Sequence, residues 1–292
     1  MALRIATRGS ALALTQARQV ADLVGGAELV EVSSHGEPGD KARFVRGVER
    51  ALLAGEVELG VHSAKDLPGE MPEGLAIAAV PPREDPLDAW IGPGGSLAEV
   101  PEGARVGTAS LRRRAQLLAT RPDLRVEELH GNVDTRLRKL AEGELDAIVL
   151  AAAGLRRLGR EAEIGFAIPA AEMVPAAGQG ALALQIRGED TATAAAVGAA
   201  GEERAFDELT AERTAVALLE ATCASPIGVH AHLDEGRLAI DAFVGLPDGS
   251  EWLRDRFETA DTFDPAAAGA ELAERLLAAG ARDLLDRAEA LA

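Results

Sequence analysis

The sequence predicts an α/β protein made of two similar parts, followed by a smaller α+β part. Strand and helix patterns alternate over the first half of the chain, and a proline-dense stretch interrupts them at 81–86. After Thr191 the pattern changes to helix and then to hairpins. With 292 residues and 47% hydrophobic composition, the chain can bury more than one core.

The first part alternates strands with helices, which favours a largely parallel sheet. Its expected strands cover 3–7, 28–32, 57–61 and 75–80. Its expected helices are one that ends before Gly25 and one over 42–54.

The second part repeats the same alternation. Its expected strands cover 104–107, 125–129 and 147–150, and its expected helices start near Ser110 and Asn132 and end before Pro122 and at Gly143. The third part is expected to hold an Ala-rich helix after Thr191, a helix over roughly 210–221, hairpins that turn at 234–236 and 247–250, and an amphipathic helix over 265–292.

Charge and cysteine content limit the possible partners. The 48 acidic and 30 basic residues give a formal charge of -18, so the surface repels polyanions and nucleic acid is not an expected partner. An anionic ligand would therefore need basic residues gathered in a cleft. The lone cysteine forms no internal disulfide, and the strand-like N-terminus differs from a signal segment, which favours a cytoplasmic protein.

Two further expectations concern the membrane and the oligomeric state. No apolar run approaches the roughly 18–20 residues that span a bilayer, so no membrane span is expected. The high negative charge, without an evident apolar seam, favours a monomer.

Arginines lie close to three expected helix starts, in the segments 7–10, 108–114 and 132–136. Each start offers free N–H groups and the positive end of the helix dipole, and guanidinium matches a carboxylate. Taken singly, Ser10, Ser110 and Asn132 read better as ordinary N-caps. The repetition of the pattern favours carboxylate binding.

Two other segments could carry chemistry. Lys65 and Asp66 follow a strand, at the sheet edge where open α/β sheets bind ligands, although a surface ion pair explains them equally well. Cys223 lies on a loop before Pro226 and Gly228, where it could be an attachment point or an inert core residue. The histidines show no zinc-ligand spacing with cysteine, so no metal is expected.

Several ordered motifs make the chain resemble the hydroxymethylbilane synthase (porphobilinogen deaminase) family over nearly its whole length. The motifs are RIATRGS at 4–10 with LAL at 12–14, HSAKDLP at 62–68, REDP at 83–86, GTASLRR at 107–113, GNVDTRL at 131–137, AGLRRLG at 153–159, PAAGQG at 175–180, and Cys223 with PIG at 226–228.

The resemblance implies a fold and a reaction. The fold has two lobes like those of periplasmic binding proteins, with the chain returning after Gly180 to finish the first lobe, and a third, smaller α+β domain. The expected domains are 1–82 with 181–199, 87–174, and 203–292. The reaction condenses four molecules of porphobilinogen, with loss of ammonia at each step, on a dipyrromethane primer. Hydrolysis then releases the linear tetrapyrrole.

The resemblance also implies residue roles. Cys223 would carry the dipyrromethane by a thioether, and Asp66 would be the catalytic residue that stabilises the cations formed during condensation. Consecutive helical residues point about 100° apart, so Arg112, Arg113 and Arg114 cannot all share one direction. The resemblance implies that Arg112 and Arg113 are the two that face inward. The other side chains expected to bind the cofactor are Lys65, Arg8, Ser10, Ser110, Arg112, Arg113, Arg136 and Arg157, and all of these except Lys65 are expected to contact its carboxylates.

The sequence departs from the family pattern at three places. The segment over 36–41 is shorter than usual, His130 stands where many relatives have arginine, and Ala221 and Thr222 replace a glycine pair before the cysteine. An anionic-solute binding protein with two lobes and an inactive paralogue are therefore the alternatives to the enzyme.

Overall fold

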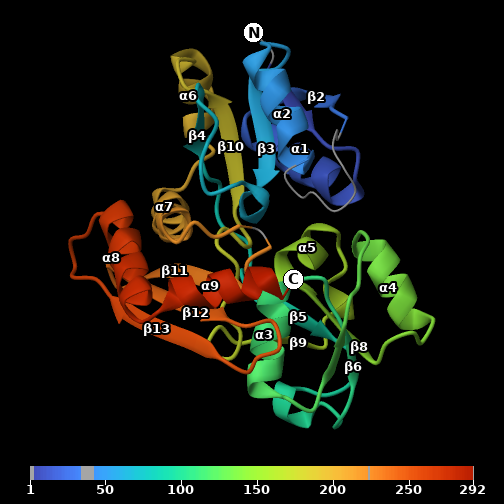
Figure 1. Ribbon diagram of the computed structural model, residues 1–292. Helices are drawn as coiled ribbons and strands as arrows, with labels where there is room; N and C mark the ends of the chain where they lie inside the picture. Colours follow the sequence, from blue (N-terminus) through green and yellow to red (C-terminus); the bar gives the residue numbers. More distant parts are fainter. Residues whose placement is uncertain (1–2, 34–42, 223, 292) are drawn as a thin grey trace.

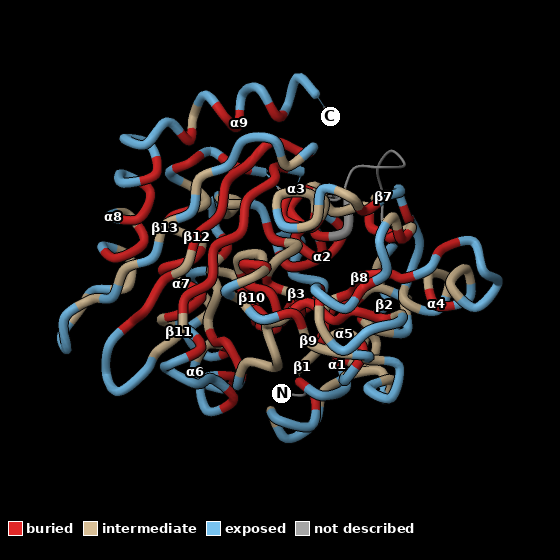
Figure 2. Tube along the Cα trace, turned by 90° about the horizontal axis from the view of Figure 1, so that it is seen from below, coloured by how far each residue is buried: buried red, intermediate tan, exposed pale blue. Residues whose placement is uncertain are grey.

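The computed structural model describes residues 3–33, 43–222 and 224–291. Within them the chain forms two five-stranded sheets and one three-stranded sheet, each covered by helices (Figure 1). The predicted class, α/β with a smaller α+β part, is confirmed. Buried residues follow the strands and the inner faces of the helices (Figure 2).

The first sheet has the strand order β2-β1-β3-β10-β4. Its strands are β1 Leu3–Thr7, β2 Ala27–Glu31, β3 Leu59–Ser63, β4 Leu75–Ala79 and β10 Leu182–Arg187. Strand β1 pairs in parallel with β2 and β3, whereas β10 is antiparallel to both β3 and β4. Helices α1 (Ala11–Leu23) and α2 (Arg43–Leu53) cover it, and α1 packs Ala17 and Val20 against Ile5. The sequence did not predict the position of β10 inside this sheet.

The second sheet repeats this plan with the order β7-β6-β8-β5-β9. Its elements are β5 Asp88–Ile91, β6 Arg105–Gly107, α3 Leu111–Thr120, β7 Arg125–Glu127, α4 Val133–Ala141, β8 Ala147–Ala151, α5 Ala152–Arg157 and β9 Phe166–Ile168. Strand β6 is parallel to β7 and β8, and β5 is antiparallel to β8 and β9. The predicted strands and helices are present, while β5, β9 and α5 were not predicted.

The third part is an antiparallel meander packed against helices. Its elements are α7 Glu203–Leu218, β11 Ile227–Asp234, β12 Arg237–Gly245, β13 Trp252–Glu258, α8 Pro265–Ala278 and α9 Ala281–Ala290, preceded by α6 Thr191–Gly198 in the first lobe. Both predicted hairpins are present.

Two helix predictions for this part need correction. The helix expected over 210–221 spans Glu203–Leu218, so it starts and ends earlier. The single helix expected over 265–292 is two helices, because Gly280 adopts a left-handed backbone with φ 101° and ends the first of them. Gly269 lets α8 approach α7 closely, since a Cβ there would lie 2.2 Å from the Ala211 carbonyl oxygen.

Two crossovers join the lobes, and the third part holds them together. Arg83 Nε, on the outgoing crossover, donates to the Gln179 carbonyl oxygen on the returning one at 2.9 Å. Both crossovers meet the buried Glu212 of α7, which accepts from Arg83 Nη1 at 2.8 Å and from the Gly178 N–H at 2.6 Å. The expected domain boundaries remain a prediction. None of the helices in the described ranges is long and apolar enough to cross a membrane.

Candidate active site

A cavity of about 480 Å³ lies where the two lobes, the returning crossover and the third part meet. Among the described residues that line it, five are cations and one, Asp66, is an anion. The cations are Lys65, Arg112, Arg113, Arg136 and Arg213. The concentration of positive charge that an anionic ligand would require is therefore present, although the protein as a whole carries a charge of -18.

Asp66 and Lys65 lie on a short 3-10 turn, Ala64–Asp66, directly after β3. This places them at the predicted sheet edge. The Asp66 carboxylate faces the Arg8 guanidinium, with 3.8 Å between Oδ2 and Nη2. Lys65 Nζ donates to Gln179 Oε1 at 3.2 Å. Burial, reinforced by the charge of Arg113, lowers the pKa of Lys65 to about 8.

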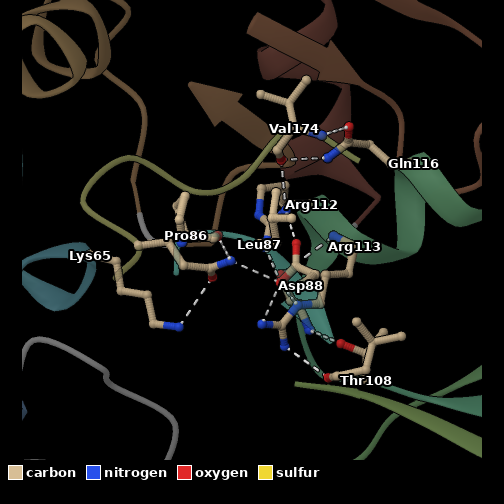
Figure 3. A network of polar contacts seen from close by, with 12 residues as sticks. Lys65, Pro86, Leu87, Asp88, Thr108, Arg112, Arg113, Gln116 and Val174 are labelled. Atoms are coloured by element: carbon tan, nitrogen blue, oxygen red, sulfur yellow. Dashed lines mark hydrogen bonds and ion pairs between the residues drawn. The ribbon is translucent and has the colours of Figure 1, made fainter. Parts of the chain in front are cut away.

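Arg112 and Arg113 both turn inward from the first turn of α3 and are 4% and 6% exposed. The inward orientation is confirmed, and Arg114, which is half-buried, is outside the set that lines the cavity. Both guanidinium groups converge on Asp88, the first residue of β5 (Figure 3). Arg112 donates to both carboxylate oxygens, at 2.7 and 3.1 Å, and to the Val174 carbonyl oxygen at 2.7 Å.

The sequence analysis missed Asp88. Its side chain is fully buried, and Arg113 Nε also donates to it at 2.8 Å. Burial pushes the pKa of Asp88 upward, but the charges of Arg112 and Arg113 outweigh it, so the pKa lies well below its ordinary value. Asp88 is thus an ionised counter-ion for two arginines. No local signal marks it, since an aspartate at the start of a short strand reads as a surface residue.

Arg136 has the opposite environment. Its Nε is buried and has no hydrogen-bond partner among the described residues. Burial, and then the charge of Arg113, lower the pKa of Arg136 to about 10. Arg136 also lines a neighbouring cavity of about 120 Å³ together with Arg157, whose Nη2 donates to the Gly180 carbonyl oxygen at 2.7 Å. Arg136 is therefore a cation placed to receive a carboxylate.

The predicted helix starts are all capped by the expected side chains. Ser10 Oγ accepts from the Ala13 N–H at 3.3 Å, Ser110 Oγ from the Arg113 N–H at 3.4 Å, and Asn132 Oδ1 from the Thr135 N–H at 2.9 Å. Only Ser110 of these three is among the residues that line the cavity. The N-cap interpretation holds for each, and carboxylate binding by Ser10 and Ser110 stays a prediction.

Residue 223 lies outside the described residues, but its neighbours reach the cavity. Thr222 and Ser225 line the cavity wall. The Thr222 N–H donates to Ser225 Oγ at 2.9 Å, and the Ala224 N–H donates to Thr222 Oγ1 at 3.2 Å. These bonds hold the loop on both sides of position 223, without the glycine pair usual in the family.

The other two departures have separate outcomes. The short segment over 36–41 lies outside the described residues. His130 is exposed and pairs with Glu128 at 3.2 Å, so it lies away from the cavity. Among the residues described, no three histidine, cysteine or acidic side chains are grouped to hold a metal.

Arg213 is a cation of the cavity that the sequence analysis missed. It projects from α7, and its Nη2 donates to the carbonyl oxygens of Pro68 and Gly69 at 2.9 and 3.0 Å. Arg213 thereby fixes the loop that follows Asp66 while its charge faces the cavity. Arg213 is one of two arginines in α7, and nothing in the local sequence distinguishes it for this role.

Comparisons with known proteins match nearly the whole chain. Residues 3–195 match the family model "Porphobilinogen deaminase, dipyromethane cofactor binding domain", and residues 206–278 match "Porphobilinogen deaminase, C-terminal domain". The porphobilinogen deaminase of Thiobacillus denitrificans is 45% identical, covering 97% of this chain and 98% of its own. That of Deinococcus radiodurans is 42% identical, covering 97% of each chain.

Solved structures that resemble the chain include a periplasmic solute binding protein of Desulfovibrio salexigens. Its TM-score is 0.42 and its identity 11%, over 70% of this chain and 73% of that one. The two family models and the full-length relatives decide the assignment: the chain belongs to the porphobilinogen deaminase family.

Proposed function

We propose that the cavity around Asp66 is where this chain acts as a hydroxymethylbilane synthase. The chain is a transferase that joins four porphobilinogen molecules, with loss of ammonia from each, and releases the linear tetrapyrrole by hydrolysis. Its cofactor is dipyrromethane. The observation that carries the placement is that the described lining of the cavity gathers five cations around one aspartate in a protein of charge -18.

The cavity suits a dipyrromethane, because each pyrrole unit bears two carboxylates. Lys65, Arg113 and Arg136 line the cavity, and the buried Arg136 Nε lacks a protein partner among the described residues. When bound, the group supplies the pyrrole carbon to which the first substrate unit is joined. Cys223 would hold it by a thioether, since Thr222 and Ser225 on either side reach the same cavity. The other side chains proposed to hold carboxylates are Arg8, Ser10, Ser110, Arg112 and Arg157.

Asp66 is proposed as the catalytic residue. Loss of ammonia leaves the substrate pyrrole electron-poor, and a carboxylate stabilises positive charge strongly in a site that excludes water. Arg8 lies beside this carboxylate, with its Nη2 3.8 Å from the Asp66 Oδ2, and forms an ion pair with it. Asp66 is the only acidic group among the described residues that line the cavity, so no second carboxylate competes for this role.

Intact mass spectrometry of the purified protein tests the proposal. The enzyme is expected to carry the added mass of a dipyrromethane, and Cys223→Ala is expected to lack it. An unmodified wild-type thiol would favour the solute-binding or inactive alternatives, and a pyrrole mass retained in Cys223→Ala would place the attachment elsewhere.

The role of Asp66 has a separate test. Asp66→Asn is expected to fold and keep the added mass, but to lose about 10²- to 10³-fold in kcat, because an amide dipole replaces a carboxylate poorly. Asp146→Asn, which alters an exposed aspartate paired with Arg105, serves as the control. Turnover of Asp66→Asn close to that of the control would remove Asp66 from the mechanism.

We further propose that the protein is a cytoplasmic monomer. The lone cysteine forms no internal disulfide, and the strong negative charge opposes self-association. Light scattering coupled to size exclusion checks the oligomeric state, and a dimer mass at low micromolar concentration would contradict it.

A further inference from the structure

Gln179 is a buried residue of the returning crossover whose polar side-chain atoms are all engaged. It is 0% exposed. Its Nε2 donates to the Pro86 carbonyl oxygen at 2.7 Å and to Asp88 Oδ1 at 3.0 Å, and its Oε1 accepts from Lys65 Nζ at 3.2 Å. The proposed function assigns no role to the PAAGQG motif that contains Gln179.

These bonds connect groups that come from different lobes (Figure 3). Lys65 follows β3 in the first lobe, and Asp88 begins β5 in the second. Asp88 in turn holds Arg112 and Arg113. The Gln179 backbone is itself fixed, because its carbonyl oxygen accepts from Arg83 Nε at 2.9 Å. A rigid amide therefore spans the two lobes at the wall of the cavity.

We propose that Gln179 is a positioning residue: it holds the Lys65 ammonium, through Asp88, in a fixed relation to the arginine pair Arg112–Arg113. This inference rests on the proposed function. A lysine has a flexible four-carbon stem, and each side chain that must be ordered on binding lowers affinity. A glutamine that orders Lys65 in advance removes this cost, and two carboxylates of one ligand then meet cations at a preset spacing.

Gln179 also stabilises the charged form of Lys65. The groups that act on Lys65 are Asp66 and Asp88, which favour the ammonium, and Arg112 and Arg113, which disfavour it together with burial. The Gln179 Oε1 atom is an acceptor for the ammonium, so its removal makes deprotonation easier. Loss of the amide should therefore change the titration of Lys65 as well as its position.

The test uses Gln179→Met, which keeps the volume and removes both hydrogen-bonding ends. Gln185→Met is the matched control, since Gln185 is also 0% exposed and bonded to side chains, His62 and Glu49, outside the cavity. The chain has only three lysines, Lys41, Lys65 and Lys139. Amine acetylation followed by peptide mass spectrometry can therefore follow the reactivity of Lys65 against pH in the purified holoenzyme, with Lys139 as the internal reference.

Gln179→Met is expected to lower the pKa of Lys65 by about one unit and to raise KM for porphobilinogen about tenfold, with kcat changed much less. Gln185→Met should leave the pKa of Lys65 and the KM unchanged, even where its thermal stability falls equally. Gln179→Glu is expected to change the pKa of Lys65 in the opposite direction, because a carboxylate beside the ammonium raises that pKa.

A Lys65 pKa that is the same in both Gln179 variants and in the control would overturn the positioning role. The acetylation measurement does not require turnover. Failure of this inference is therefore distinguishable from failure of the proposed function, which would instead appear as a missing dipyrromethane mass.

Discussion

Replacing Asp88 by asparagine tests whether this carboxylate is the counter-ion that stabilises the two buried arginines beside the cavity. In the wild type, Arg112, Arg113 and Asp88 sum to one positive charge in a region that is almost fully buried. Asp88→Asn keeps the shape but leaves two guanidinium groups without a counter-ion. Breaking a buried pair in this way costs about 3–5 kcal/mol of unfolding free energy. For a chain of this size that corresponds to a fall in Tm of roughly 10 °C.

The same reasoning predicts how the difference in unfolding free energy between wild type and Asp88→Asn depends on pH. The arginines hold the pKa of Asp88 below its unfolded value of about 3.9, so the stabilisation is present above about pH 4 and is lost as pH falls below it. The stability gap between wild type and Asp88→Asn should therefore be constant between about pH 5 and 8. It should narrow in acid, where the wild-type carboxyl also becomes neutral.

Urea unfolding followed by circular dichroism measures this gap. The double variant Asp88→Asn/Arg112→Gln restores the net charge of the cluster, so it should recover part of the lost stability. An Asp88→Asn protein as stable as wild type at pH 7, or a gap that widens in acid, would refute the argument that Asp88 is an ionised counter-ion.

Two other variants separate binding from stability. Arg136→Gln removes a half-buried cation whose Nε is buried without a partner among the described residues, so Tm should stay equal or rise while KM for porphobilinogen increases about 10- to 100-fold; a Tm loss as large as that of Asp88→Asn would contradict this. Burial lowers the pKa of His62 to about 4, below the unfolded value of about 6.5. As the pH falls, the imidazole is therefore protonated in the unfolded chain before it is protonated in the folded one. The free energy of unfolding is expected to fall by about 3 kcal/mol between pH 6.5 and pH 4. His62→Gln should flatten this decline in urea unfolding measured at pH 7 and 4.5, and an unchanged slope would assign the decline to other groups.

Local sequence patterns were sufficient for the elements that depend on local interactions. Ser10, Ser110 and Asn132 mark helix starts because each side chain caps its own helix, three residues away. The order of strands in a sheet has no such local signal. Strand β10 lies between β3 and β4, although more than 100 residues separate it from either in sequence. Strand β5 has four residues, too few to show a period.

The candidate site also contains some residues that local sequence patterns predict and others that they do not. The overall charge of -18 predicted that an anionic ligand would need cations gathered in a cleft, and the arginines at helix starts indicated which ones. Asp88 and Gln179, which form hydrogen bonds with the cations of the site, could not be predicted, because their partners are distant in sequence. Asp88 lies 24 residues from Arg112 and Gln179 lies 114 from Lys65.

The contacts of Asp88 and Gln179 show that the arginines of the site have different environments. Of the five N–H groups of Arg112, three are already bonded to Asp88 and Val174, so it contributes to the cavity mainly as part of a fixed cluster. Over the described part of the chain Arg136 shows no such counter-ion, and its buried Nε remains available for a ligand carboxylate. A motif that reads as a uniform set of basic residues therefore contains two kinds of cation. One kind, Arg112 and Arg113, is held in place by the counter-ion Asp88, and the other, Arg136, has a buried Nε without a partner among the described residues.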